Sequence, residues 1–113
     1  MQSASRSRFS IYSSRLHPRR PLDVRVCLLA IDANGEWLRL YGRTRDLSLS
    51  GACLTLPCML PHGSEVALQL RLPRGESFAI RAIVIRRQGS RLGVRFLETS
   101  AAQRLMLAAY CRG

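Results

Sequence analysis

Apolar and polar residues alternate along much of this chain, starting at position 22. From there every second residue is apolar: Leu22, Val24, Val26, Leu28 and Ala30. A period of two is typical of a β-strand that buries one face. The dipeptide Asn34-Gly35 follows, and Asn-Gly favours a tight hairpin turn. The pattern therefore predicts a strand over 22–30, a hairpin, and a return strand over 37–45.

Four more alternating runs follow, separated by turn residues such as Pro57, Pro61 and Gly63 and by the segments PRGE (73–76) and QGS (88–90). They predict strands over 52–56, 65–72, 78–87 and 91–97. The chain carries no internal repeat and no alternation of strands with helices. Six short strands joined by turns are typical of a small antiparallel barrel.

The end of the chain changes period. Ser100 and Gln103 have the spacing of a capping box, which marks the start of a helix. Apolar residues then recur at helical spacing: Ala102, Leu105, Met106 and Ala109. We expect an all-β fold with one C-terminal helix, a six-stranded antiparallel barrel over 15–113. Residues 1–14 are rich in serine and arginine and predict a flexible N-terminal arm.

The composition points to an anionic partner. The chain has 113 residues, enough for one domain, and a formal charge of +11 from 18 basic and 7 acidic residues. All the basic residues are arginine, whose planar fork of donors suits phosphates and guanine edges. A general preference for arginine explains part of the total charge but not its clustering. A nucleotide, a nucleic acid or an acidic protein remains open as partner.

Other functional classes find no support in the residues. The 4 cysteines form no CxxC pair and only 2 histidines occur, so no zinc spacing appears and no metal site is expected. There is no nucleophile elbow, no pair of carboxylates placed for acid–base chemistry, and no phosphate-binding glycine loop, so we expect no enzyme and no cofactor. No apolar run approaches the ~18 residues that a membrane span needs. We expect a cytoplasmic protein with free thiols.

Two short segments stand out from this background. The first, RLHPRR, contains Arg15 and Arg19, and the second, RDLSLSG, contains Asp46-x-Ser48-x-x-Gly51. Taken singly, the first is typical of a solvated basic loop and the second of a turn. However, one precedes the first strand and the other follows its hairpin partner, so an antiparallel pairing brings them to the same end of the sheet. Arginine suits the acceptor edge of guanine and a carboxylate suits its N–H donors.

The order Arg15-x-x-x-Arg19, then Asp46-x-Ser48-x-x-Gly51, then Gly93-Val94-Arg95-Phe96 resembles the PilZ domain. That family has RxxxR, DxSxxG and a GVxF-like strand before a final helix, and the resemblance covers about 14–112. It implies a six-stranded barrel that serves as a receptor for the bacterial second messenger cyclic di-GMP. It also implies an adaptor that signals to an unidentified effector protein, with an N-terminal segment that folds over the nucleotide.

The resemblance assigns roles to single residues. Arg15 and Arg19 would contact guanine and phosphate, Asp46 and Ser48 would bind a guanine edge, and Gly51 would let the backbone turn close to the ligand. Arg20 adjoins Arg19 and would share its role in binding the ligand. Further candidates for phosphate contacts are Arg43, Arg45 and Arg86.

Two alternatives remain. One is an interaction module of the same fold that does not bind nucleotide. The other is an arginine-rich nucleic-acid binder, which is disfavoured because the aromatic residues (1 Trp, 3 Tyr and 3 Phe) are not arrayed as a stacking face.

Overall fold

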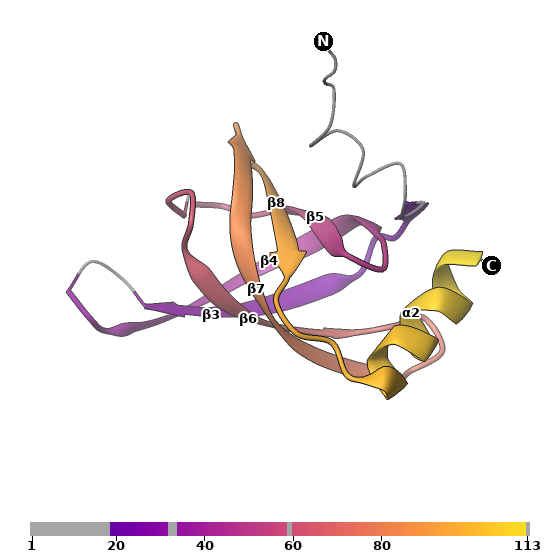
Figure 1. The fold of residues 1–113 in the computed structure, drawn as a ribbon. Helices are drawn as coiled ribbons and strands as arrows, with labels where there is room; N and C mark the ends of the chain where they lie inside the picture. The colour runs from indigo at the N-terminus through magenta and orange to yellow at the C-terminus, as the bar shows by residue number, and fades with distance from the viewer. Residues whose placement is uncertain (1–18, 32–33, 59, 113) are drawn as a thin grey trace, which may run out of the picture.

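A computed structural model describes residues 19–31, 34–58 and 60–112. The predicted arm, residues 1–14, lies outside the described residues, as does Arg15. The elements in chain order are β2 (Arg20–Pro21), β3 (Arg25–Ile31), β4 (Trp37–Leu47), β5 (Gly51–Thr55), β6 (Glu65–Arg71), β7 (Ser77–Gln88), β8 (Arg91–Phe96) and α2 (Ala101–Arg112). Figure 1 shows the strands curling around one another, with α2 at one end.

All strand pairs are antiparallel, and the order in the sheet is β2-β4-β3-β6-β7-β8-β5. An additional pairing between β4 and β5 joins the two ends. The six longer strands thus form a closed barrel, and the short β2 attaches beside β4. The predicted six-stranded antiparallel barrel with a C-terminal helix is confirmed. In the described part of the chain, no helix is long and apolar enough to cross a membrane.

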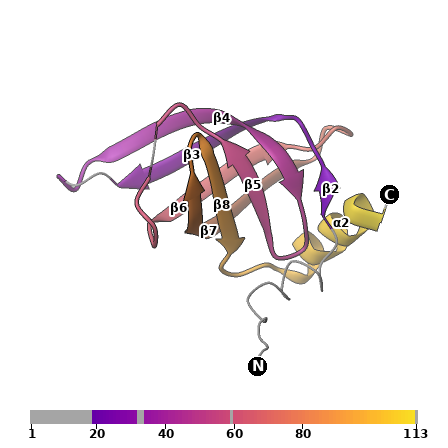
Figure 2. The same ribbon diagram turned by 90° about the horizontal axis from the view of Figure 1, so that it is seen from above.

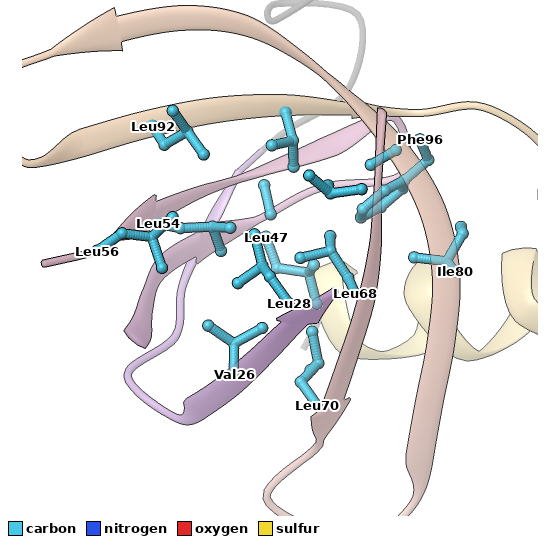
Figure 3. Close-up of a cluster of buried hydrophobic side chains, with 14 of the residues drawn as sticks. Val26, Leu28, Leu47, Leu54, Leu56, Leu68, Leu70, Ile80, Leu92 and Phe96 are labelled. Atoms are coloured by element: carbon cyan, nitrogen blue, oxygen red, sulfur yellow. The ribbon is translucent and has the colours of Figure 1, made fainter. Parts of the chain in front are cut away.

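The inward positions of the strands meet in one apolar core. Leu28, Leu54 and Leu68 are fully buried or nearly so, and each comes from a different strand. Figure 3 shows their side chains converging inside the barrel. Phe78 and Phe96 pack edge to face with ring centres 5.9 Å apart. The alternation in the sequence reflects this arrangement, because each strand buries every second side chain.

The first strand differs from the prediction at its start. Leu22 and Val24 face inward as expected, but the regular strand begins only at Arg25. The connection before it is held by Thr44, whose buried hydroxyl donates to the carbonyl oxygen of Leu22 (2.6 Å) and accepts from the amide of Val24 (2.9 Å). The side chain adds to the backbone hydrogen bonds here, in which the Thr44 amide donates to the Val24 carbonyl (2.9 Å) and the Leu22 amide to the Arg45 carbonyl (3.0 Å).

The segment before that connection was predicted to be a loop, and for Arg20 this is wrong. Arg20 pairs with Leu47, and Pro21 pairs with Asp46, so β2 lies along the end of β4. Pro21 is tolerated there because a proline can occupy the edge of a sheet. This short pairing carries Arg19 to the end of β4.

The return strand is longer than predicted. It was expected to end at Arg45, but β4 continues to Leu47. Thr44 and Leu47 are both buried although they are three positions apart, and the register against β5 shifts between Thr44 and Asp46. Arg45 is therefore the extra residue of a β-bulge, which resets the alternation without ending the strand. The bulge leaves Arg45 and Asp46 side by side toward solvent.

The helix begins as predicted. The amide of Gln103 donates to the Ser100 hydroxyl (3.1 Å), and the amide of Ser100 donates to the Gln103 side chain (3.0 Å). This is the reciprocal pattern of a capping box. Leu107 is fully buried against the barrel, while Met106 and Tyr110 pack at the edge of the core. Figures 1 and 2 both show α2 at one end of the barrel and the β3–β4 hairpin at the other.

Candidate functional site

The structure brings Arg19 and Asp46 together. The guanidinium of Arg19 lies 3.8 Å from the carboxylate of Asp46, and both side chains keep contact with solvent. The pairing of Pro21 with Asp46 explains this proximity, because it leads the chain past the end of β4 just after Arg19. Two of the segments singled out in the sequence therefore meet on the outside of the barrel.

Both residues line a broad open groove of about 960 Å³. Its wall along β4 carries Arg43, Arg45 and Asp46, and Thr55 of β5 contributes to the opposite side. The size falls within the usual range of ligand-binding clefts. Arginines from two segments of the chain give the groove a cationic rim, which suits phosphate groups.

The arginines of this rim are not equally engaged. Arg43 forms a 2.6 Å ion pair with Asp23 and also donates to its backbone carbonyl (3.2 Å). Arg45 forms no ion pair with any described residue. Exposed ion pairs contribute little to stability, so the Arg43 pair can be exchanged for a ligand at small cost. Because Arg45 has no ion pair with a described residue, it can contact a ligand without first breaking one.

A row of paired residues crosses the outer surface of the barrel beside this groove. Asp46 pairs with Cys53 of β5, Cys53 pairs with Gly93 of β8, and Gly93 pairs with Arg86 of β7. A Cβ on Gly93 would lie 3.3 Å from that of Arg86, so both residues face the same side. The two middle residues are small. The row is thus a low floor with the carboxylate of Asp46 at one end and the side chain of Arg86 at the other. The two residues are three strand spacings of about 4.8 Å apart.

Cys53 and Gly93, the two small residues of this floor, were not among the site residues expected from the sequence. Burial raises the pKa of the Cys53 thiol, and the negative charge of Asp46 adds to this, while Arg19, Arg45 and Arg91 lower it. The thiol therefore lies within electrostatic reach of both the acid and the arginine cluster. The alternation over 51–55 was a signal for its outward position, because Cys53 falls between the buried Ala52 and Leu54.

Ser48 is buried and holds the turn between β4 and β5. Its hydroxyl accepts from the amides of Ser50 and Gly51, both at 3.2 Å, and the Ser48 amide donates to the Gly51 carbonyl (2.9 Å). Serine commonly bonds its own turn in this way. The hydroxyl shapes the end of β4 beside Asp46, and a direct contact with a ligand stays a prediction.

Glycine is needed at position 51 for a different reason from the expected one. It is buried in β5 and is not among the described glycines with positive φ. A Cβ at this position would collide with the backbone carbonyl of Val94 in β8. Glycine is required here because two backbones approach closely, and not because the chain needs a left-handed turn.

Arg20 points away from the groove that Arg19 lines. Its guanidinium lies 5.3 Å from the centre of the Tyr110 ring in α2, and Tyr110 donates its hydroxyl to the Pro21 carbonyl (3.2 Å). Arg20 lines a separate, smaller pocket of about 210 Å³ beside α2. Adjacent arginines thus serve two surfaces: Arg19 faces the groove and Arg20 fastens β2 to the helix.

Comparison with known proteins agrees with this architecture. A family model described as PilZ domain matches residues 13–113. The PilZ domain of CeSA from a cellulose-synthesizing bacterium is 25% identical, with a TM-score of 0.63 and coverage of 84% of this chain and 95% of that one. The PilZ domain of YcgR from Escherichia coli, solved with c-di-GMP, is 23% identical, with a TM-score of 0.63 and coverage of 85% and 87%.

A third similar structure is that of MotI/DgrA, the inhibitor of motility from Bacillus subtilis. It is 18% identical, with a TM-score of 0.67, and the match covers 85% of this chain and 48% of that one. No curated protein matches the chain. The family model covers nearly the whole sequence, and the closed barrel with its C-terminal helix accords with it. The chain therefore belongs to the PilZ domain family.

Proposed function

We propose that this chain is a receptor for cyclic di-GMP that binds the nucleotide on the outer surface beside Arg19 and Asp46. The main support for the proposal is the 3.8 Å distance between the guanidinium of Arg19 and the carboxylate of Asp46, next to the low floor made by Cys53 and Gly93. The similar domain of YcgR from Escherichia coli was solved with the same nucleotide. A bacterial second messenger acts in the cytoplasm, and we place the proposed receptor there.

The chemistry of guanine fits this pair. Arg19 supplies donors for the N7 and O6 acceptors of one edge, and Asp46 supplies only acceptors, which suit the N–H groups of another edge. In the free protein the two groups hold each other loosely, so a ligand replaces a weak contact with several directed hydrogen bonds. The small residues of the floor leave room for a flat ring to approach the strands.

The phosphates would meet the arginines around the floor. Arg45, at the bulge, and Arg86, at the far end of the row, are placed for this, and Arg43 can join after leaving Asp23. Arg15 has the spacing to act with Arg19 but lies outside the described residues. Each hydrogen bond to a charged group contributes about 1.5–3 kcal/mol. The loss of one such contact should therefore weaken binding about tenfold or more.

The receptor would act as an adaptor rather than as an enzyme. The ligand selects a state in which the arm, including residues 6–14, is ordered over the nucleotide, and this builds a new charged surface for an effector protein. The arm lies outside the described residues, so its ordering is part of the proposal.

Calorimetry with cyclic di-GMP tests the proposal. We expect heat that saturates at about one or two ligands per chain and an affinity at least tenfold lower, about 1.4 kcal/mol, in Arg19→Ala. Arg87→Ala removes an equal charge from the exposed end of β7 and serves as the matched control. No heat with the folded wild type would favour the interaction module that does not use nucleotide. Binding to DNA that falls steeply with salt and ignores guanine competitors would favour the nucleic-acid binder.

A further inference from the structure

The β3–β4 hairpin projects from the barrel at the end opposite α2 (Figures 1 and 2). Three large apolar residues on it face solvent: Trp37 is 71% exposed, Ile31 58% and Tyr41 56%. Ile31 and Trp37 pair directly across the two strands, so they form one continuous patch near the tip. Neither lines the groove beside Arg19. Large exposed side chains gathered in this way are typical of an interaction surface.

The same hairpin offers an open sheet edge. On the side away from β3, β4 pairs with β5 only from Arg43 onward, and no described residue pairs there with 37–41. The end of β5 approaches β4 at Gly42, where a Cβ would collide with the Thr55 carbonyl. Beyond that point the edge is unpaired within the described part of the chain.

The direction of the free backbone groups follows from the register. The amide of Thr44 donates to Val24, so the even-numbered residues of this part of β4 bond to β3. The amides and carbonyls of Trp37, Arg39 and Tyr41 therefore point to the open edge. Such a row is the template on which an extended segment of another protein can add as a strand.

The charge on this edge selects the partner. Arg39 lies between the two aromatic residues, and the neighbouring Tyr41 raises the pKa of its guanidinium. Arg25 pairs directly with Arg43 on the neighbouring strand, so cations also face each other further along the hairpin. Among the described residues, neither Arg25 nor Arg39 has an ion pair. Tryptophan, tyrosine and arginine are the residues that most often anchor protein interfaces.

We propose that the open edge of β4 over 37–41 binds an acidic partner protein, which adds an extended segment to the sheet with a carboxylate toward Arg39 and an apolar side chain against Trp37 and Ile31. This inference deepens the proposed adaptor function, because it names the surface and the chemistry of the effector. A second copy of this chain does not fit. Symmetric pairing of two edges about Arg39 would set like charges opposite each other, between proteins that each carry +11.

The single tryptophan of the chain, Trp37, reports directly on this surface. The probe is a peptide in which every second residue is by turns glutamate and valine, with threonine between them, so that one face of the extended peptide carries both acidic and apolar side chains. It is titrated without nucleotide. We expect a saturable blue shift of the tryptophan emission and an affinity at least tenfold lower in Arg39→Glu. Arg87→Glu makes the same change of charge on an exposed residue of β7 and should bind the peptide as the wild type does.

Two further probes separate strand addition from general attraction. The same peptide with lysine in place of glutamate should give no shift. An acidic peptide N-methylated at alternate amides keeps its side chains but cannot form the ladder, and it should bind at least tenfold more weakly. The proposal would be overturned if the methylated peptide bound as tightly as the unmethylated one, or if Arg39→Glu and Arg87→Glu lost the same affinity. It would also be overturned if the acidic peptide gave no saturable shift of the tryptophan emission. So would a dimer in sedimentation that Trp37→Ser abolishes.

The result is independent of the receptor proposal. Arg39→Glu should still bind cyclic di-GMP in calorimetry, because Arg39 is not among the residues that line the groove. Peptide binding without nucleotide binding would support the proposed interaction edge and contradict the receptor proposal. Nucleotide binding without peptide binding would contradict only the proposed interaction edge.

Discussion

The guanidinium of Arg19 lies 3.8 Å from the carboxylate of Asp46, although the two residues belong to segments on either side of a β-hairpin. Their side chains are 44% and 25% exposed, so water weakens the attraction between them. A contact of this kind adds little to the stability of the barrel. It does keep the donors of Arg19 next to the acceptor oxygens of Asp46. In the proposed complex a guanine base would replace the contact between them.

Replacing Asp46 by alanine should reduce the choice between nucleotides more than the binding of anions in general. In the proposed complex the carboxylate accepts hydrogen bonds from guanine N–H groups, and adenine does not present the same donors on that edge. We expect the preference for cyclic di-GMP over cyclic di-AMP, measured by competition in calorimetry, to fall at least tenfold in Asp46→Ala. A variant that keeps the full preference would show that Asp46 does not read the base.

Arg19 and Arg20 should give different results although they are neighbours. Arg19→Ala, and equally Arg15→Ala, should lower nucleotide affinity at least tenfold without changing the melting temperature. Arg20→Ala should leave affinity within about twofold, and it should lower stability by about 0.5–1 kcal/mol because the contact with Tyr110 is lost. Calorimetry and chemical denaturation on the three variants measure both effects. If Arg20→Ala lost affinity as Arg19→Ala does, Arg20 would belong to the binding site.

Gly51→Ala should destabilise the barrel by about 1–3 kcal/mol, because the new methyl group meets the Val94 carbonyl and two strands must separate. Gly93→Ala is the matched control, since its Cβ would lie 3.3 Å from the Cβ of Arg86, and a shift of a few tenths of an ångström relieves that contact. Urea denaturation should therefore show a smaller loss for Gly93→Ala. A Gly51→Ala variant as stable as the wild type would contradict the close approach of β5 and β8.

The thiol of Cys53 should react slowly with an alkylating reagent at neutral pH. Burial and then Asp46 raise its pKa above that of an ordinary thiol, so the reactive thiolate forms only under more alkaline conditions. Cys58 is exposed and serves as the internal control in mass spectrometry of the labelled peptides. At alkaline pH, cyclic di-GMP should protect Cys53 and not Cys58. Unchanged labelling of Cys53 in a nucleotide-saturated sample would place the ligand elsewhere.

The sequence alone was sufficient for most of the fold. Alternation recorded which side chains each strand buries, and the pairing of Ser100 with Gln103 marked the start of the helix. These signals are local, because strand period and helix capping depend on residues only a few positions apart. The motifs also indicated the meeting of Arg19 with Asp46, since a hairpin joins the ends of its two strands.

Only the tertiary structure decided how those residues are presented. The bulge at Arg45 arises because Thr44 and Leu47 must both face the core against β5, which is a long-range requirement. The row from Asp46 to Arg86 depends on the register of four strands. The different directions of the Arg19 and Arg20 side chains depend on where α2 places Tyr110. A one-dimensional pattern records the burial of each position. It does not record which strands become neighbours, and that choice is made by the free energy of packing the whole barrel.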